Sequence, residues 1–149
     1  MTKFVSFRLG LIIKIYLSKR HYVGIYDDSA YIFLNSIGIT KEFIKENLKG
    51  CFMLRHDIHY LNEVHFNEKV STYIRILNIS NSKKRLHFNF YMLKENEVSS
   101  FCEGIVAFAN LKKRTTETFP IEILEKLEKM KKEHENLEWK QKTNLILEK

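Results

Sequence analysis

The stretch HYVGIYDDSAYIFLNSIGI, residues 21–39, decides how the rest of the chain can fold. Apolar and aromatic side chains recur in it at steps of three and four residues, which is the spacing of one face of an α-helix. These positions are Tyr22, Tyr26, Ala30, Phe33 and Ile37, with Val23 and Leu34 widening the stripe. Gly38 follows the last of them, where helices often end in a left-handed residue. We therefore expect one long helix whose wide apolar stripe is buried against other parts of the chain.

The segments on either side of this helix have the composition of strands. Residues 3–17 are rich in β-branched and aromatic side chains, so we expect a strand there, with a bend at Gly10. Thr40 can cap a short second helix over residues 41–48, which Gly50 ends. Short connectors separate the strand-like segments that follow, and this predicts antiparallel hairpins. The segments are residues 51–64, 69–79, 85–93 and 98–111.

Pro120 predicts the start of a last helix, because proline is tolerated in the first helical turn. The expected apolar side of this helix consists of Ile121, Leu124, Leu127 and Met130. The apolar pattern thins after that point, so we divide the chain into a single domain, residues 1–130, and a charged helical tail, residues 131–149. A five-stranded antiparallel sheet wrapped around a long central helix, with an extra C-terminal helix, is an α+β arrangement of the hotdog type.

Positive charge is concentrated at the start of the chain. The formal net charge is +7, and residues 1–20 contain five basic residues and no acidic one, which accounts for +5 of it. Such a patch can meet nucleic acid, a membrane surface or coenzyme phosphates. The chain has neither a dense basic face nor a nucleic-acid docking motif, so we do not expect nucleic acid or a membrane as partner. The apolar run 9–17 contains Lys14 and is too short to cross a bilayer.

The two cysteines, Cys51 and Cys102, have neither metal-ligand spacing nor a disulfide framework. We therefore expect reduced thiols in a cytoplasmic protein. Three histidines, His56, His59 and His65, are close in sequence, but strand alternation would put His56 on the face opposite the other two. We expect no metal site.

The chain from about residue 20 to about residue 130 resembles the acyl-CoA thioesterases of the hotdog superfamily, in the hydroxybenzoyl-CoA thioesterase-like branch. The helix quoted above is similar to that family's central helix, with an aromatic residue, an acidic pair, a small residue and a closing Ile-Gly. Further along, the order of several stretches resembles the thioesterases linked to carnitine and betainyl-CoA breakdown. These stretches are IHYLNEV (58–64), KKRLH (83–87), the small-residue strand 102–109 and Phe119-Pro120.

The resemblance implies a homodimer or tetramer with a site between subunits, acyl-CoA as the substrate, and no cofactor beyond the coenzyme A that the substrate carries. The family usually has an Asp, a Gly-His pair and an Asn just before the central helix. Residues 12–20, IIKIYLSKR, contain none of them. The usual acid therefore has no counterpart at that place in this chain.

Thioester hydrolysis needs a polarised carbonyl, and the free amides at a helix start can supply it. We expect these amides around Tyr22, Val23 and Gly24. His21 could donate to the substrate carbonyl, or it is simply a surface histidine at the helix start, which is the commoner case. Gly24 would let a ligand approach the backbone closely, or would merely relieve packing against a strand.

The reaction also needs a carboxylate. Related hotdog branches place it on the central helix, so Asp27 and Asp28 are candidates by resemblance. Asp27 borders the apolar stripe, where burial would raise its pKa, and Asp28 lies nearer the polar side. Alternatively, both simply face water at the positive end of the helix. Glu63 is a third candidate, although a structural role is commoner for such a residue.

The coenzyme phosphates need cations. Lys83, Lys84 and Arg85 are our candidates, the turn at residues 112–114 is another, and either triplet can instead be a solvated turn. The prediction from sequence is a thioesterase acting on a short- or medium-chain acyl-CoA. The alternative is a non-catalytic hotdog protein that binds acyl-CoA or acyl carrier, or serves as an interaction module.

Overall fold

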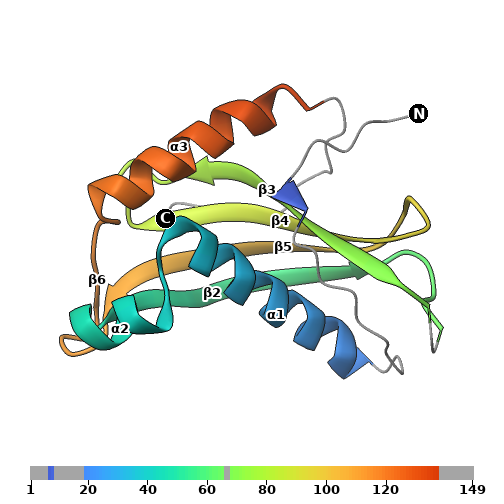
Figure 1. Ribbon diagram of the computed structural model, residues 1–149, viewed down its shortest axis with the longest axis horizontal. Coiled ribbons are helices and arrows are strands. Elements are labelled where there is room, and N and C mark those ends of the chain that lie inside the picture. Colours follow the sequence, from blue (N-terminus) through green and yellow to red (C-terminus); the bar gives the residue numbers. More distant parts are fainter. Residues whose placement is uncertain (1–6, 9–18, 66–67, 138–149) are drawn as a thin grey trace.

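The computed structural model describes residues 7–8, 19–65 and 68–137 of the chain. Its elements in chain order are β1 (Phe7–Arg8), α1 (Lys19–Ile37), α2 (Lys41–Asn47), β2 (Lys49–Tyr60), β3 (Val70–Ile79), β4 (Arg85–Lys94), β5 (Glu97–Asn110), β6 (Thr115–Thr116) and α3 (Ile121–Glu135). The strands form one antiparallel sheet in the order β1-β3-β4-β5-β2, and β6 pairs with β5 off this path. The helix α1 crosses one face of this sheet (Figure 1). The predicted hotdog fold is confirmed.

The predicted elements are found with small shifts at their ends. The central helix begins at Lys19 rather than at residue 21. The Thr40 side chain accepts a hydrogen bond from the Phe43 backbone amide and caps α2, as expected. Of the strand predicted over residues 3–17, the structure describes only Phe7–Arg8, which pairs with β3. The bend predicted at Gly10 lies outside the described residues.

The apolar stripe of α1 is buried against the sheet, together with two residues that the helical pattern had not included. Tyr22, Tyr26, Phe33 and Ile37 are buried as predicted, and so are Ile25 and Ser29. The Ser29 hydroxyl bonds to the Ile25 carbonyl at 2.7 Å and to the Thr72 hydroxyl of β3 at 2.9 Å, which satisfies a polar group inside the core. The sheet side of this contact is mainly aromatic and aliphatic: Ile74, Leu86, Phe88, Phe90 and Phe108.

Gly104 of β5 explains how two bulky layers fit at the middle of the sheet. A Cβ at this position would lie 2.4 Å from Cζ of Phe88 on the neighbouring strand. The Phe88 ring therefore packs directly on bare backbone. A side chain here would force the ring to move within a tightly packed core.

The core-facing side of α3 is largely the one predicted, because Leu127 is buried and Leu124 and Met130 pack against the core. Ile123, Leu127 and His134 are buried, whereas Ile121 is 69% exposed. The prediction is wrong at Ile121 alone, and Ile123 is the first core residue of the helix instead. The helix also continues to Glu135, five residues past the predicted domain boundary, so the division of the chain stays a prediction and residues 138–149 lie outside the described part.

Candidate functional site

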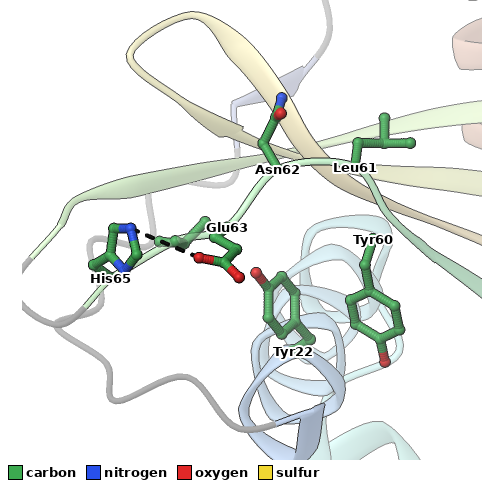
Figure 2. A pocket seen from close by; sticks show the side chains of 7 residues that line it. Tyr22, Tyr60, Leu61, Asn62, Glu63 and His65 are labelled. Atoms are coloured by element: carbon green, nitrogen blue, oxygen red, sulfur yellow. Dashed lines mark ion pairs between the residues drawn. The ribbon is translucent and has the colours of Figure 1, made fainter.

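An open pocket of about 380 Å³ lies beside the first turns of α1. It is lined by Tyr22 and by the six residues Tyr60–His65 that leave β2. The Tyr22 and Tyr60 rings meet edge to face with centroids 5.0 Å apart (Figure 2). Two predicted site residues, Tyr22 and Glu63, are therefore brought together.

Tyr22 is held by its own polar contacts within this pocket. Burial raises the pKa of its hydroxyl, which is hydrogen-bonded to the Val64 backbone, so the phenol stays protonated near neutral pH. In Figure 2 the Glu63 carboxylate points toward that hydroxyl. The Glu63 side chain is 89% exposed and its carboxylate lies 3.9 Å from His65. Glu63 is thus a water-facing acid at the rim of the pocket.

Lys94 is a cation at this rim that the sequence analysis missed. Its ammonium group donates to the Glu63 backbone carbonyl at 3.1 Å and to the Glu68 carboxylate at 3.1 Å. The sequence placed Lys94 in a connector between strands, whereas it is the last residue of β4. Its pairing with Val70 in the ladder brings it beside the segment that follows β2, a placement that only the sheet register defines.

Asp27 and Asp28 both lie on the exposed side of α1. The expectation that the apolar stripe buries Asp27 is wrong for the single chain, because the neighbouring Tyr26 takes the inward position and donates to Ser100 at 2.8 Å. The two carboxylates still differ. Burial raises the pKa of the Cys102 thiol to about 12, and the charges of Asp57 and Asp27 add to the effect. Asp27 is thus one of the carboxylates whose charge acts on this β5 thiol.

His56 is a residue of β2, the strand that pairs with β5. In the ladder His56 is opposite Gly104, and Ile58 is opposite Cys102, so His56 and Ile58 share the face that α1 covers. His59 is on the other face, where it stacks on Phe101 at 4.3 Å and bonds Asp57 at 2.9 Å. The predicted alternation of His56 and His59 is confirmed.

The start of α1 alters which backbone amides are free. A helix that begins at Lys19 uses the Val23 and Gly24 amides in its own hydrogen bonds, so the free donors precede Val23. A Cβ at Gly24 would meet no heavy atom of the described residues within 4 Å. The packing role considered for Gly24 is therefore wrong. Gly24 is exposed, while His21 and Val23 are partly buried.

The predicted phosphate-binding triplet lies at the far end of the sheet. Arg85 is level with Ala107 of β5, whereas Tyr60 is level with Ser100, and seven strand residues span about 23 Å. Lys83 forms an ion pair with Glu128 at 2.7 Å. The structure does not bring this turn and the Tyr22 pocket together within one chain.

Both cysteines are free thiols, and burial raises the pKa of each to about 12. They are therefore poor nucleophiles. Over the described ranges, no three His, Cys, Asp or Glu side chains gather as metal ligands would. None of the helices described is long and apolar enough to cross a membrane.

Comparison with protein families matches residues 15–127 to the Thioesterase-like superfamily. The chain belongs to this superfamily. A comparison with curated protein sequences found no match.

Solved structures with the same fold include two that align over nearly the whole chain. One is a protein from Staphylococcus aureus characterised in complex with CoA, with a TM-score of 0.82, 17% identity and coverage of 98% of this chain and 100% of that one. Another is a candidate thioesterase from Pseudomonas putida, with a TM-score of 0.79, 17% identity and 98% coverage of both chains. A gentisyl-coenzyme A thioesterase aligns with a TM-score of 0.66 and 14% identity, over 76% of this chain and 96% of that one.

Proposed function

We propose that this protein hydrolyses an acyl-CoA thioester, with Asp27 as the catalytic carboxylate. The observation that carries the proposal is the position of Asp27 in a chain of the Thioesterase-like superfamily. Asp27 is accessible to water and substrate on α1, yet near enough to β5 to raise the pKa of the Cys102 thiol. The structural neighbours characterised with CoA and as a gentisyl-coenzyme A thioesterase support the same substrate class.

In the proposed reaction the Asp27 carboxylate accepts a proton from water as the water oxygen attacks the thioester carbonyl carbon. The carbonyl oxygen becomes negative, and the free amides at the start of α1 stabilise it. The carbon–sulfur bond then breaks, and the coenzyme leaves as a thiol after taking up the proton. Asp28 and Glu63 remain alternative carboxylates for this step, because each is exposed close to the same end of the molecule.

The space beneath the middle of α1 leaves no room for a long acyl chain. An apolar cavity beneath the helix, next to Ala30, Leu34 and Val106, measures only about 20 Å³. A long acyl chain would need the helix to move away from the sheet. The small cavity therefore favours the short end of the short-to-medium range expected from sequence.

We infer that two copies pair through β2, which is the assembly that the family resemblance implies. This strand is 12 residues long and lies at the sheet edge. Phe52, Met53 and Leu54 are 47%, 42% and 50% exposed on it. A long apolar edge strand offers unpaired backbone groups to a second strand. Antiparallel pairing would set the Lys49 end of one subunit beside the Tyr60 end of the other.

The two free thiols also favour a reducing compartment, and we propose a cytoplasmic location on this ground. Detection of the protein in a cytoplasmic fraction tests this inference. Recovery with the membrane or the secreted material would contradict it.

The experiment that tests the function measures thiol release from a panel of acyl-CoAs with the full chain. We expect Asp27→Asn to lower kcat by about 100-fold or more, because the amide cannot accept the proton. Asp28→Asn makes the same chemical change one residue away and distinguishes the two carboxylates: it should retain most of the activity if Asp27 is the base, and loss of activity in Asp28→Asn alone would assign the role to Asp28. Equal activity of wild type and Asp27→Asn would remove Asp27 from the mechanism.

The alternative is an acyl-CoA-binding protein without hydrolysis. The observation that favours it is the absence of the usual Asp and Gly-His residues from positions 12–20. Tight binding of acyl-CoA by the wild type, with no thiol release from any member of the panel, would support this alternative. It would contradict the proposal of hydrolysis.

A further inference from the structure

The face of the sheet opposite α1, which we call the outer face, is buried in its middle. The side chains concerned lie on β4 and β5 and alternate along these strands with residues of the main core. They are at most 7% exposed: His87, Asn89, Tyr91, Phe101, Glu103 and Ile105. The Glu103 carboxylate lies 2.7 Å from Nε2 of His87, away from water. Charged and aromatic side chains reach such low exposure when another part of a protein lies over them.

The described helices do not lie over the middle of the outer face. α1 and α2 pack on the main-core side, as the contact between the Phe43 and Phe108 rings shows for α2. α3 runs along the β3 edge (Figure 1). It meets the outer face at Arg75, which donates to the Leu137 carbonyl at 3.4 Å. The layer over β4 and β5 is therefore not one of these helices.

Asn89 is a second sign of a covering layer. Its side-chain nitrogen donates to the Tyr91 hydroxyl at 3.1 Å. Its side-chain oxygen is buried and, within the described part of the chain, accepts no hydrogen bond. Buried side-chain oxygens nearly always have a donor, so a segment that brings polar groups to this face fits it better than a purely apolar one.

An apolar hollow continues the outer face toward β6. It has a volume of about 250 Å³, and Ala107 and Ala109 of β5 form its floor. Phe52 is opposite Ala107 in the ladder and next to Cys51, which packs on the main core, so the Phe52 ring is on the outer face. Arg114 is at the rim and forms no ion pair with another described residue. We call this hollow the β6 groove.

We propose that residues 138–149 of the same chain lie across the outer face, with the apolar cluster 145–147 in the β6 groove. This segment, EWKQKTNLILEK, has an aromatic residue, Trp139, near its start and the cluster Leu-Ile-Leu near its end, with polar residues between them. The cluster suits an apolar hollow, because three consecutive apolar side chains are unfavourable in water. The polar residues between them bring donors to the buried polar side chains of β4 and β5.

The end of α3 is close enough for this segment to reach the groove. Arg75, which binds the Leu137 carbonyl, is level with Glu103 two strands away, a distance of about 10 Å. Ala107 is four residues further along β5, or about 13 Å, so the direct path is about 16 Å. The eight residues from Leu137 to Leu145 can span about 26 Å when extended.

The charges of the segment also match the surface. Glu148 comes directly after the apolar cluster, and the Arg114 guanidinium at the rim can bind its carboxylate through two donors. Lys140 and Lys142 come before the cluster and would pass the row of the sheet that contains the buried Glu103 carboxylate. Each end of the proposed path therefore pairs opposite charges.

Two other occupants are less well placed. Residues 9–18 join β1 to the start of α1, which packs on the main-core side. Arg8 is level with Tyr73 and so with Phe101, which is six residues, or about 20 Å, from Ala107 of the groove. A second copy is not needed to explain the burial, because the outer face is already buried in a single chain. A covered outer face leaves the β2 edge as the surface for a second copy.

A single tryptophan placed in the cluster tests the proposal. Trp139 is the only tryptophan of the chain, so the double variant Trp139→Phe, Ile146→Trp reports on the cluster alone. We expect its emission to lie at shorter wavelength in the folded protein than in urea, and acrylamide to quench it less, because the groove shields the ring from water. The matched control is Trp139→Phe, Lys45→Trp, which puts the ring on the exposed side of α2. Emission and quenching like those of this control would overturn the proposal.

A cross-link shows which chain supplies the occupant. Thr116 is an exposed residue at the groove, so Ile146→Cys with Thr116→Cys should form a disulfide within one chain on mild oxidation. Ile146→Cys alone is the control for reaction with Cys51 and Cys102, and it should stay reduced. A disulfide between two chains would mean that a second copy fills the groove. That result, or no disulfide at all, would overturn the proposal, and neither depends on thioester hydrolysis.

Discussion

One edge of the sheet is covered by other parts of the described chain, and the other edge is open. At the β3 edge, β1 pairs with Ile74, and the Ile76 amide donates to Nδ1 of His134 on α3 at 2.9 Å. Arg75 of β3 also donates to the His134 carbonyl at 2.8 Å. Figure 1 shows α3 running along this edge. The β2 edge has no such cover in the described chain, and its middle residues are among the most exposed apolar ones.

This difference between the two edges indicates which one can pair with a second copy of the chain. An exposed strand edge has amides and carbonyls that can pair with another chain, so proteins cover such edges or use them. The His134 and Arg75 contacts satisfy groups at the β3 edge within the chain. The β2 edge has exposed apolar side chains and, within the described chain, backbone groups with no strand partner, and we propose for that reason that the dimer forms there.

The largest effect on assembly and on thiol release is expected from a charged side chain on the open β2 edge. Met53→Glu should leave the chain folded but monomeric, and it should lower thiol release by about 100-fold or more if the site needs both subunits. Light scattering and the thiol assay measure the two effects. Ile121→Glu is the control, because Ile121 is an equally apolar and more exposed residue on α3, outside the open edge. A dimeric Met53→Glu variant would contradict pairing through β2.

A smaller effect, on the free energy of unfolding, is expected from truncating the side chain that packs α3 against the core. Leu127 of α3 is fully buried in the main core, so Leu127→Ala should lower the free energy of unfolding by about 2–5 kcal/mol. Urea denaturation measures this loss. Ile121→Ala removes a comparable side chain from an exposed position on the same helix and should change stability by less than about 0.5 kcal/mol. Similar losses in both variants would mean that α3 does not pack as described.

The smallest effect concerns the imidazole that caps β3. Burial, followed by the positive charge of Arg75, lowers the pKa of His134 below its usual 6.5. The folded state therefore favours the neutral ring, whose Nδ1 can accept the Ile76 amide. The contribution of His134 to stability is complete above pH 6.5 and is lost as the pH falls below it toward the lowered folded value.

His134→Gln keeps a side chain that can accept a hydrogen bond but removes the titration. At pH 8 its free energy of unfolding should be within about 1 kcal/mol of wild type. Between pH 7 and pH 5 the variant should lose less stability than wild type in urea denaturation. Parallel pH profiles for the two proteins would show that His134 does not titrate on folding.

Much of the fold could be predicted because periodicity reports it directly. The spacing of Tyr22, Tyr26, Phe33 and Ile37 predicted the central helix, and the strands after it were found within a few residues. Leu124, Leu127 and Met130 of α3 face the core as predicted, but the first core residue of this helix could not be predicted. Ile121 and Ile123 both fit a helical stripe through Leu127, and only contact with the sheet decides which one is buried.

Less of the candidate site than of the fold could be predicted from the sequence. The chain order gave no reason to place Lys94 beside Glu63. The helical pattern placed Asp27 at the border of the buried stripe, whereas Asp27 and Asp28 are both exposed. The two basic turns look alike in sequence, but Lys83 is paired with Glu128, whereas residues 112–114 form no ion pair with another described residue. Contacts between residues far apart in the chain determine these properties.

We could predict the wide apolar helix, the run of antiparallel strands and so the hotdog arrangement from the sequence, because the spacing of apolar side chains is a local property of the chain. Only the folded chain shows which edge of the sheet stays open, which carboxylates face water and which cations form ion pairs. Each of those depends on the register of strands and on the packing of α3, where residues distant in sequence compete for the same neighbours.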